Sequence, residues 1–273
     1  MSAAPLAHPA ARPGASSPWA AFAAGRLGRL ARGLAILVAV FAVWEALVVV
    51  FAIRPYYVPR PSAIFATLLQ TPAPYVQGFL RTLSETLLGF VSGALFGVGM
   101  GLVFFRARAL RELVFPIFIV SQTIPVIAFG ALVVLWFGNT LLAKAAIAFY
   151  LTFFPVTVNT LLGLESVDPR QEALLRSFGA SPWQLMTRLQ FPTALPQIFV
   201  ALRLASSLAL VGAIVGEWFG DTVGLGVLLL QGMYTENVVS IWATLLVSAL
   251  LGTGFYSAVA FAERVLVFWG AEQ

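Results

Sequence analysis

Residues 83–105 read LSETLLGFVSGALFGVGMGLVFF, an apolar run whose only charged residue is Glu85. A helix rises 1.5 Å per residue, so this run is long enough to cross the hydrocarbon core of a bilayer, about 30 Å thick. Its glycines recur every four residues, at Gly89, Gly93, Gly97 and Gly101. Such a small-residue stripe is typical of close packing between helices rather than of a binding site. The run therefore predicts a transmembrane helix that packs tightly against a second helix.

The rest of the chain repeats this apolar pattern. Hydrophobic residues make up 60% of the sequence and charged residues 10%, against about 45–50% and 25% in soluble domains. Further apolar runs of spanning length cover residues 33–53, 113–137, 141–163, 194–216 and 238–262. No small-residue cleavage site and soluble domain follow the first run, so we expect a retained helix rather than a signal peptide. The sequence predicts an all-α membrane protein with six transmembrane helices.

The remaining segments are read from their composition. Residues 1–32, rich in Ala, Pro, Ser and Arg, predict a disordered cytoplasmic tail. Residues 54–81 contain several prolines and predict an external segment with one short helix over residues 62–70, which Ser62 can cap. Within residues 217–237, Gly224 and Gly226 interrupt the chain, which predicts a short re-entrant or interfacial helix. The first transmembrane helix at 33–53 thus precedes a membrane core over residues 82–268.

The positive charges indicate an orientation. With the N-terminus inside, twelve of the 16 Lys and Arg residues fall on the cytoplasmic side and four on the external side, the bias expected of inner-membrane proteins. We expect both termini in the cytoplasm. The net charge of +5 does not indicate nucleic-acid binding, because the arginines sit in small groups beside apolar runs. Lys144, the single lysine, falls on the external side and is expected to be dispensable.

The residue inventory limits the chemistry. Cysteine is absent and His8 is the only histidine, which removes disulfides, thiolate nucleophiles and the usual metal ligands. A membrane-embedded enzyme would need clustered His, Asp or Glu, and the sequence has almost none of these. We expect no catalytic residue, no metal site and no cofactor.

The longest cytoplasmic connection, residues 164–193, reads LESVDPRQEALLRSFGASPWQLMTRLQFPT. Asp168 can cap one short helix, which Gly179 ends where a positive φ costs least. Ser181 can cap a second short helix, which runs until Pro192. The pattern predicts an L-shaped element of two short helices.

The loop also carries apolar residues on a segment that should face the cytosol: Phe178, Trp183, Leu185 and Met186. Exposed apolar side chains usually mark a partner surface, and Trp is a preferred anchor. The same residues could instead pack against the protein's own helix ends. Both interpretations remain open from the residues alone.

The loop resembles the EAA motif of permease subunits of type I bacterial ABC importers, also called binding-protein-dependent transport system inner membrane components. The family pattern is Glu-Ala-Ala, three residues, Gly, nine residues and then Ile-x-Leu-Pro. Here Gly179 is followed at that spacing by LQFP at 189–192, and SVDPR at 166–170 and GASPWQL at 179–185 are similar to the branch for nitrate, sulfonates, taurine and bicarbonate. The resemblance extends to PRPS at 59–62, LWFG at 135–138 and the segment 216–226.

The resemblance implies a MetI-like fold in the bacterial inner membrane and a permease homodimer. It also implies a cytoplasmic ABC ATPase subunit, itself a dimer, that binds ATP, and an external solute-binding protein that delivers a small solute. A nucleotide-binding lysine is absent from this chain, because Lys144 follows Ala143 and not Gly. The residues that the motif assigns to the ATPase-coupling loop are Glu172, Ala173, Gly179, Ala180, Ser181, Trp183, Leu185 and Pro192.

One position departs from the family pattern. The family's glutamate belongs where this chain has Ala173, and Glu172 lies one residue earlier. One residue is about 100° around a helix, so the role of this carboxylate stays open.

Polar residues in the apolar runs are candidates for a translocation path. They are Gln122, Thr123, Pro125, Asn159, Ser206, Ser207 and Glu217. The alternative role is packing between helices for most of them and, for Glu217, an ion pair with Arg81. Glu85, four residues after Arg81, is expected to form an ion pair with it.

A secondary transporter driven by an ion gradient is the alternative function. That class tends to show internal repeats and buried acid–base relays, and neither is evident in this sequence. The solute is open among sulfonates, nitrate, bicarbonate, pyrimidine or thiamine precursors and riboflavin. The aromatic residues Trp44, Trp136, Trp218 and Tyr150 lean towards a flat heterocycle, although aromatic residues also anchor at membrane interfaces. Whether the permease pairs with itself or with a different chain is also open.

Overall fold

The structure is a computed structural model that describes residues 25–269. Most of the predicted tail, residues 1–24, lies outside the described part. Residues 26–32 are described and belong to the first helix, so the prediction that the tail extends to residue 32 is wrong. Within residues 25–269 the regular elements are all helical: α2 (Arg26–Val50), α3 (Pro61–Gln70), α4 (Pro72–Arg106), α5 (Arg108–Ser121), α6 (Val126–Phe137), α7 (Leu141–Glu165), α8 (Pro169–Ser177), α9 (Pro182–Leu185), the π-helix η1 (Met186–Gln190), α10 (Phe191–Glu217), α11 (Leu225–Tyr234) and α12 (Val238–Leu266).

Five helical segments in the described residues are long and apolar enough to span a membrane. They are Ala31–Val50, Pro72–Arg106, Leu141–Glu165, Pro182–Glu217 and Val238–Leu266. The sixth predicted span, residues 113–137, is not one helix but the pair α5 and α6, bent by 98° between them. Pro125 explains the break, because it lacks the N–H that would bond to residue 121 and disfavours helical backbone at Ile124. The count reaches six only when this bent pair is taken as one span.

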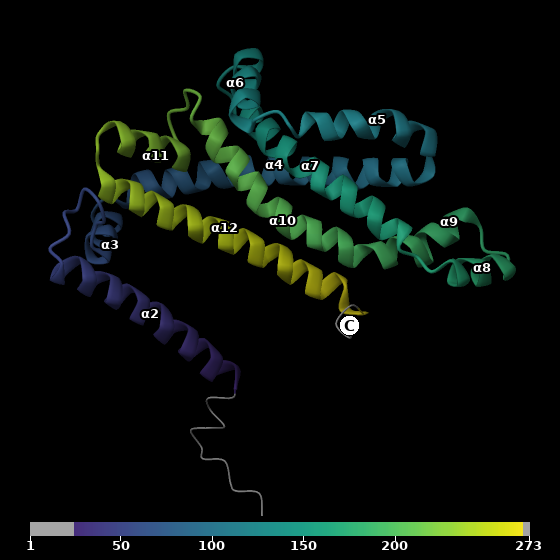
Figure 1. Cartoon of the computed structure of the whole chain (residues 1–273), viewed down its shortest axis with the longest axis horizontal. Helices are drawn as coiled ribbons and strands as arrows, with labels where there is room; N and C mark the ends of the chain where they lie inside the picture. The colour runs from purple at the N-terminus through teal and green to yellow at the C-terminus, as the bar shows by residue number, and fades with distance from the viewer. Residues whose placement is uncertain (1–24, 270–273) are drawn as a thin grey trace, which may run out of the picture.

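The core is formed by α4, α7 and α10, which run side by side along the long axis (Figure 1). The predicted glycine stripe of α4 packs against α7. A Cβ added at Gly89 would lie 2.3 Å from Ala148 Cβ, and one at Gly93 would lie 2.7 Å from Thr152 Cβ. Only glycine allows the two helix backbones to approach this closely, so the interpretation as a packing stripe is confirmed.

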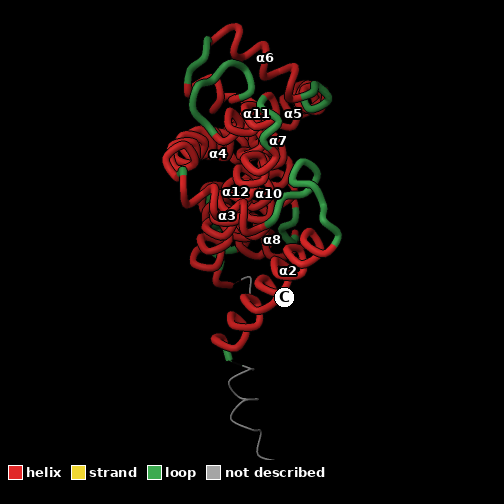
Figure 2. Tube along the Cα trace, turned by 90° about the vertical axis from the view of Figure 1, so that its left-hand side faces the viewer, coloured by secondary structure: helices red, strands yellow, loops and turns green. Residues whose placement is uncertain are grey.

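Helix α2 projects away from this core (Figure 2), and most of its apolar side chains are exposed. Ser62 links it to α3, since the Ser62 N–H and Oγ both donate to the Glu45 carboxylate, at 3.0 and 2.8 Å. The prediction that Ser62 caps its helix is therefore wrong. The helix begins at Pro61 with Arg60 in the N-cap position, and the Ser62 hydroxyl serves the contact between helices instead.

Candidate functional site

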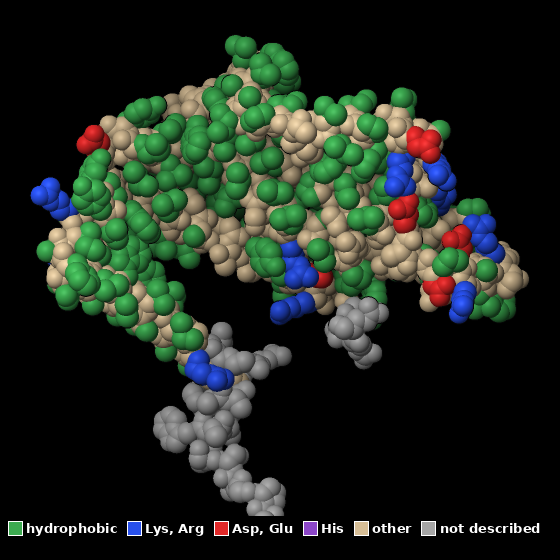
Figure 3. Space-filling model, in the orientation of Figure 1, with side chains coloured by type: hydrophobic (Ala, Val, Ile, Leu, Met, Phe, Trp, Pro, Cys, Tyr) green, Lys and Arg blue, Asp and Glu red, His purple; other side chains and the backbone are tan. Residues whose placement is uncertain are grey.

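The short helices α8 and α9 lie together at one end of the long axis, and α3 and α11 lie at the other (Figure 1). Charged side chains gather at the α8–α9 end, with both signs interspersed (Figure 3). The face shown between the two ends is mainly apolar, as a surface in lipid should be.

Local hydrogen bonds build the two short helices as the sequence predicts. Asp168 accepts a hydrogen bond of 2.8 Å from the Arg170 N–H at the start of α8. Ser181 and Gln184 form a reciprocal capping box at the start of α9, with bonds of 2.8 and 3.2 Å. Gly179 between the helices has φ +78, a conformation that L side chains rarely adopt. The two short capped helices and the turn at Gly179 between them are confirmed.

Its end differs from the prediction. The chain does not leave the helix at Pro192 but continues through η1 into α10, so residues Pro182–Glu217 form one continuous helical segment. The wider turn of a π-helix precedes Pro192, which lacks the N–H that a regular helical bond would need. The coupling-loop candidate is therefore joined directly to a membrane-spanning helix.

The apolar side chains of the loop divide into two groups. Leu185 and Met186 are only 2% and 7% exposed, and Met186 packs in a cluster with Leu164. For Leu185 and Met186 the partner-surface interpretation is therefore wrong, because the last residue of α9 and the first residue of η1 are both buried within the protein. Phe178 and Trp183 remain 80% and 72% exposed.

Leu174 joins Phe178 and Trp183 as an exposed apolar residue, at 57%. Leu174 is not among the apolar loop residues noted from the sequence. The signal that could have indicated an exposed position is its place in the sequence of α8, as an apolar residue between Glu172 and Arg176. Together Leu174, Phe178 and Trp183 are called the exposed triad below.

The carboxylate of Glu172, one residue before the family position, forms an ion pair within its own helix. Glu172 Oε1 accepts from Arg176 Nε at 3.1 Å and from Arg176 Nη2 at 2.5 Å. Ala173, where the family has its glutamate, is exposed, and Ala180 is half-buried.

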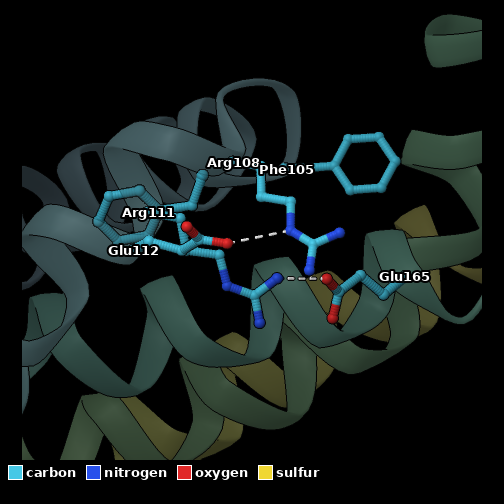
Figure 4. A pocket seen from close by; sticks show the side chains of 6 residues that line it. Phe105, Arg108, Arg111, Glu112 and Glu165 are labelled. Carbon is cyan, nitrogen blue, oxygen red and sulfur yellow. Dashed lines mark hydrogen bonds and ion pairs between the residues drawn. The ribbon is translucent and has the colours of Figure 1, made fainter.

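A cavity of about 470 Å³ lies beside the loop, between the adjoining ends of α4, α5 and α7 (Figure 4). Arg108 pairs with Glu112 at 3.1 Å, and Arg111 pairs with Glu165 at 2.5 Å. The second pair fastens the start of α5 to the end of α7. The Arg108–Glu112 pair stays within α5, so all four charges are engaged in internal pairs and one of the two pairs joins two helices.

The break between α5 and α6 exposes Thr123 and Pro125 and leaves Gln122 half-buried. The Ser121 carbonyl accepts from the Ile124 N–H at 3.2 Å and also from the Tyr150 hydroxyl of α7, which lies 3.4 Å from the Ile124 carbonyl. Tyr150 therefore adds a side-chain hydrogen bond to the backbone turn at the break. Sequence reasoning included it only among the aromatic residues.

The other path candidates do not meet in one place. Asn159 Oδ1 accepts from Gln197 Nε2 at 2.8 Å, and Asn159 Nδ2 donates to the Pro155 carbonyl at 2.8 Å. The Ser206 hydroxyl is buried and donates to the Arg203 carbonyl at 2.7 Å. Both therefore act as internal packing groups, whereas Ser207 is exposed.

Glu217 is the last residue of α10 and belongs to a buried polar cluster. This cluster lies at the end of the molecule where α11 is found. It is 1% exposed and accepts from Thr82 Oγ1 at 2.6 Å and from the Gly226 N–H at 2.5 Å. The predicted pair of Arg81 and Glu85 is present at 2.8 Å. Among residues 25–269 no group of three or more His, Asp or Glu is placed to hold a metal ion.

A cavity of about 550 Å³ lies against this cluster and is lined in part by Glu217, Trp218, Asp221, Gln231 and Tyr234. Two aromatic rings, an amide and two carboxylates could contact a polar planar molecule there.

The model of the family described as binding-protein-dependent transport system inner membrane component matches residues 93–266. The formylaminopyrimidine transport permease protein ThiX of Halalkalibacterium halodurans is 34% identical, over 81% of this chain and 88% of the relative. The riboflavin transport system permease protein RibX of Chloroflexus aurantiacus is 31% identical, over 84% and 86%. The taurine transport system permease protein TauC of Escherichia coli is 27% identical, over 70% and 72%.

A chain of the MetNI methionine ABC transporter, solved in inward-facing conformations, has a similar fold. The TM-score is 0.63 and the identity 20%, over 71% of this chain and 96% of the other. The predicted MetI-like fold is confirmed by this similarity.

Proposed function

The chain belongs to the family of binding-protein-dependent transport system inner membrane components and is the inner-membrane permease subunit of an ABC importer, and we propose that its α8–α9 loop docks the ATPase subunit. ATP hydrolysis belongs to a separate subunit in this class, so the chain itself is a transporter component and not an enzyme. An ion-gradient-driven transporter is not favoured, since the relatives are ABC permeases.

The exposed triad carries the proposal. Trp183 is 72% exposed although Leu185, two residues later on the same short helix, is 2% exposed. The buried residue fixes the helix to the permease, and the exposed one presents a large apolar ring on a rigid support. A rigid aromatic anchor loses little entropy on binding, which is why Trp is favoured at interfaces. Burial of the Trp183 ring would contribute roughly 1.5–3 kcal/mol.

The continuity of Pro182–Glu217 supports the role in coupling. A partner that displaces α9 also displaces the end of α10, because no loop separates them. This arrangement transmits movement of the ATPase to a membrane-spanning helix.

We place the α8–α9 end in the cytoplasm, where ATP is available to the ATPase subunit. The gathering of arginines at this end supports the orientation, since positive residues are retained on the cytoplasmic side.

A homodimer would form the translocation path between two copies. Ser207 is an exposed polar residue on the membrane-spanning α10, and Thr123 is an exposed polar residue in the break between the apolar helices α5 and α6. Exposed polar groups at membrane depth almost always face other protein or a water-filled cavity. The path would therefore use Thr123, Ser207 and the Pro125 break rather than Asn159 or Ser206.

The solute is proposed to be a flat nitrogen heterocycle delivered by an external binding protein. The relatives named for formylaminopyrimidine and riboflavin are 34% and 31% identical, against 27% for the taurine permease. Trp218 and Tyr234 beside the 550 Å³ cavity suit a planar ring.

Co-purification with the ATPase subunit tests the docking surface. Trp183→Ala should reduce recovery of the ATPase in detergent and abolish uptake, while membrane levels of the permease stay normal. Leu142→Ala is the matched control, because Leu142 is also exposed, at 69%, but lies at the start of α7. Normal ATPase recovery and uptake with Trp183→Ala would make the loop a plain connector.

A further inference from the structure

Lys144, near the start of α7, is 0% exposed. Lysine is almost never fully buried unless it is paired, and its Nζ lies 3.1 Å from Asp221 Oδ2. Its stem passes Gly216 of α10, where an added Cβ would lie 3.0 Å from Lys144 Cγ. The expectation that Lys144 is dispensable rested on the absence of a nucleotide-binding motif around it, and it took no account of the buried ion pair with Asp221.

Asp221 lies on the connection between α10 and α11. Its side chain is 8% exposed, and Arg81 Nη2 of α4 lies 3.7 Å from the same Oδ2 that Lys144 contacts. Burial raises the pKa of Asp221, but the hydrogen bond from the Thr222 N–H and the charges of Lys144 and Arg81 outweigh it and lower the pKa below its ordinary value. Asp221 is thus held as an anion between cations from two different helices.

The connection itself has little regular structure, since residues 218–224 are turns and bends. Gly220 has φ +84, and the Asn139 side chain donates to its carbonyl. One residue before the connection, Glu217 binds the Gly226 N–H, and the Leu225 N–H donates to Thr82 Oγ1 at 3.0 Å. The polar cluster therefore joins α4, α7, α10 and the start of α11.

The cluster and the coupling loop occupy opposite ends of one helical segment. Pro182–Glu217 is 36 residues long and ends one turn before Asp221. At 1.5 Å per residue this segment measures about 54 Å. Any displacement of the loop end therefore acts on the α10–α11 connection through a single continuous helix.

We propose that Lys144 is a positioning residue for transport, which pairs with Asp221 to fasten the α10–α11 connection to α7. Arg81 fastens the same carboxylate to α4. With this ion-pair latch formed, α10 and the start of α11 move with α4 and α7 as one unit. Without it, the connection opens locally and the movement of α10 is no longer passed on to α11.

The test compares three variants of the permease, each purified with its ATPase in nanodiscs, where both membrane faces are accessible. They are Lys144→Met, Asp221→Asn and the double variant Lys144→Met/Asp221→Asn. Each single variant leaves a buried charge without its main partner and should lower the thermal midpoint. The double variant removes both charges, so its midpoint should return towards that of the parent.

Hydrogen exchange of the backbone over residues 218–226 separates positioning from folding. All three variants, including the double, should exchange there about 10-fold faster than the parent, which corresponds to about 1.4 kcal/mol of local opening. The maximal rate of uptake in proteoliposomes should fall in all three at an unchanged half-saturating concentration of binding protein. Recovery of the ATPase should stay normal, which distinguishes this defect from loss of the α8–α9 docking surface.

Arg54→Met is the control, because Arg54 is an exposed cation on the α2–α3 connection. It should match the parent in exchange and thermal midpoint. The proposal would be overturned if Lys144→Met took up solute at the rate of the parent. It would also be overturned if the double variant kept the slow backbone exchange of the parent over residues 218–226 together with full uptake.

Discussion

Gly97 of α4 lies so close to Val156 of α7 that a Cβ on the glycine would come within 2.8 Å of the valine Cβ. Two residues further along the same helix, a Cβ on Gly99 would meet nothing within 4 Å. The two positions share a helix and a residue type but face opposite surroundings. They allow the packing of the core to be tested with matched substitutions.

Gly97→Ala should destabilise the permease, because the added methyl forces α4 and α7 apart. Overpacking of this kind costs about 1–3 kcal/mol. Gly99→Ala should be neutral or stabilising, since a Cβ at this half-buried position meets open space and alanine is preferred over glycine in a helix by about 0.5–1 kcal/mol. Thermal unfolding of the two purified proteins in detergent measures the difference. Equal midpoints would show that α4 and α7 are not in close contact.

Gly179→Val should uncouple the loop. Valine in the left-handed region costs roughly 1–2 kcal/mol, so α9 would turn away from its position and take Trp183 with it. Gly179→Asn is the control, because asparagine tolerates this region. Uptake and ATPase recovery should be lost with valine and largely kept with asparagine. If both variants behaved like the parent, the turn at Gly179 would have no part in docking.

Glu172→Ala should be mild. The carboxylate is bound to Arg176 of the same helix, and an i,i+4 pair at the surface contributes only about 0.3–0.5 kcal/mol. Uptake should stay within about threefold of the parent, a factor that corresponds to less than 1 kcal/mol. A complete loss of uptake with normal protein levels would show that Glu172 performs the role of the family's glutamate despite its shifted register.

Tyr150→Phe should weaken the junction of α5 and α6. The ring remains to stack on Phe129, with ring centroids 4.1 Å apart, while the donor to the Ser121 carbonyl is lost. The Ser121 carbonyl keeps its 3.2 Å bond from the Ile124 N–H, so the expected loss is that of one hydrogen bond, about 0.5–1.5 kcal/mol. Tyr75→Phe is the comparison, since its hydroxyl makes only a 3.3 Å contact with Ser240 Oγ. Thermal midpoints should fall more for Tyr150→Phe; the reverse order would contradict the role given to Tyr150.

Features encoded by local sequence could be predicted. The apolar runs, the caps at Asp168 and Ser181 and the positive φ of Gly179 depend on neighbouring residues only. The glycine stripe was equally readable, because its four-residue spacing defines one helix face whatever that face contacts.

Features that depend on distant partners could not be predicted. The burial of Lys144 on α7 depends on Gly216 of α10 and on Asp221 after it, both far away in the sequence. Pro125 and Pro192 carry similar local signals, yet one breaks its helix and the other does not. The difference lies in what satisfies the backbone: Tyr150 supports the break at Pro125, and a π-helix carries the chain past Pro192.

The proposed orientation predicts opposite labelling of two equally exposed residues. Phe178 on the α8–α9 loop and Tyr234 at the end of α11 are 80% and 84% exposed and lie at opposite ends of the molecule. The chain contains no cysteine, so Phe178→Cys and Tyr234→Cys each introduce a single thiol. In intact spheroplasts a membrane-impermeant maleimide should label Tyr234→Cys and leave Phe178→Cys unlabelled, because arginine-rich ends are retained in the cytoplasm. In inverted vesicles the pattern should be reversed. Labelling of Phe178→Cys from outside would invert the orientation and remove the α8–α9 loop from the side on which the ATPase works.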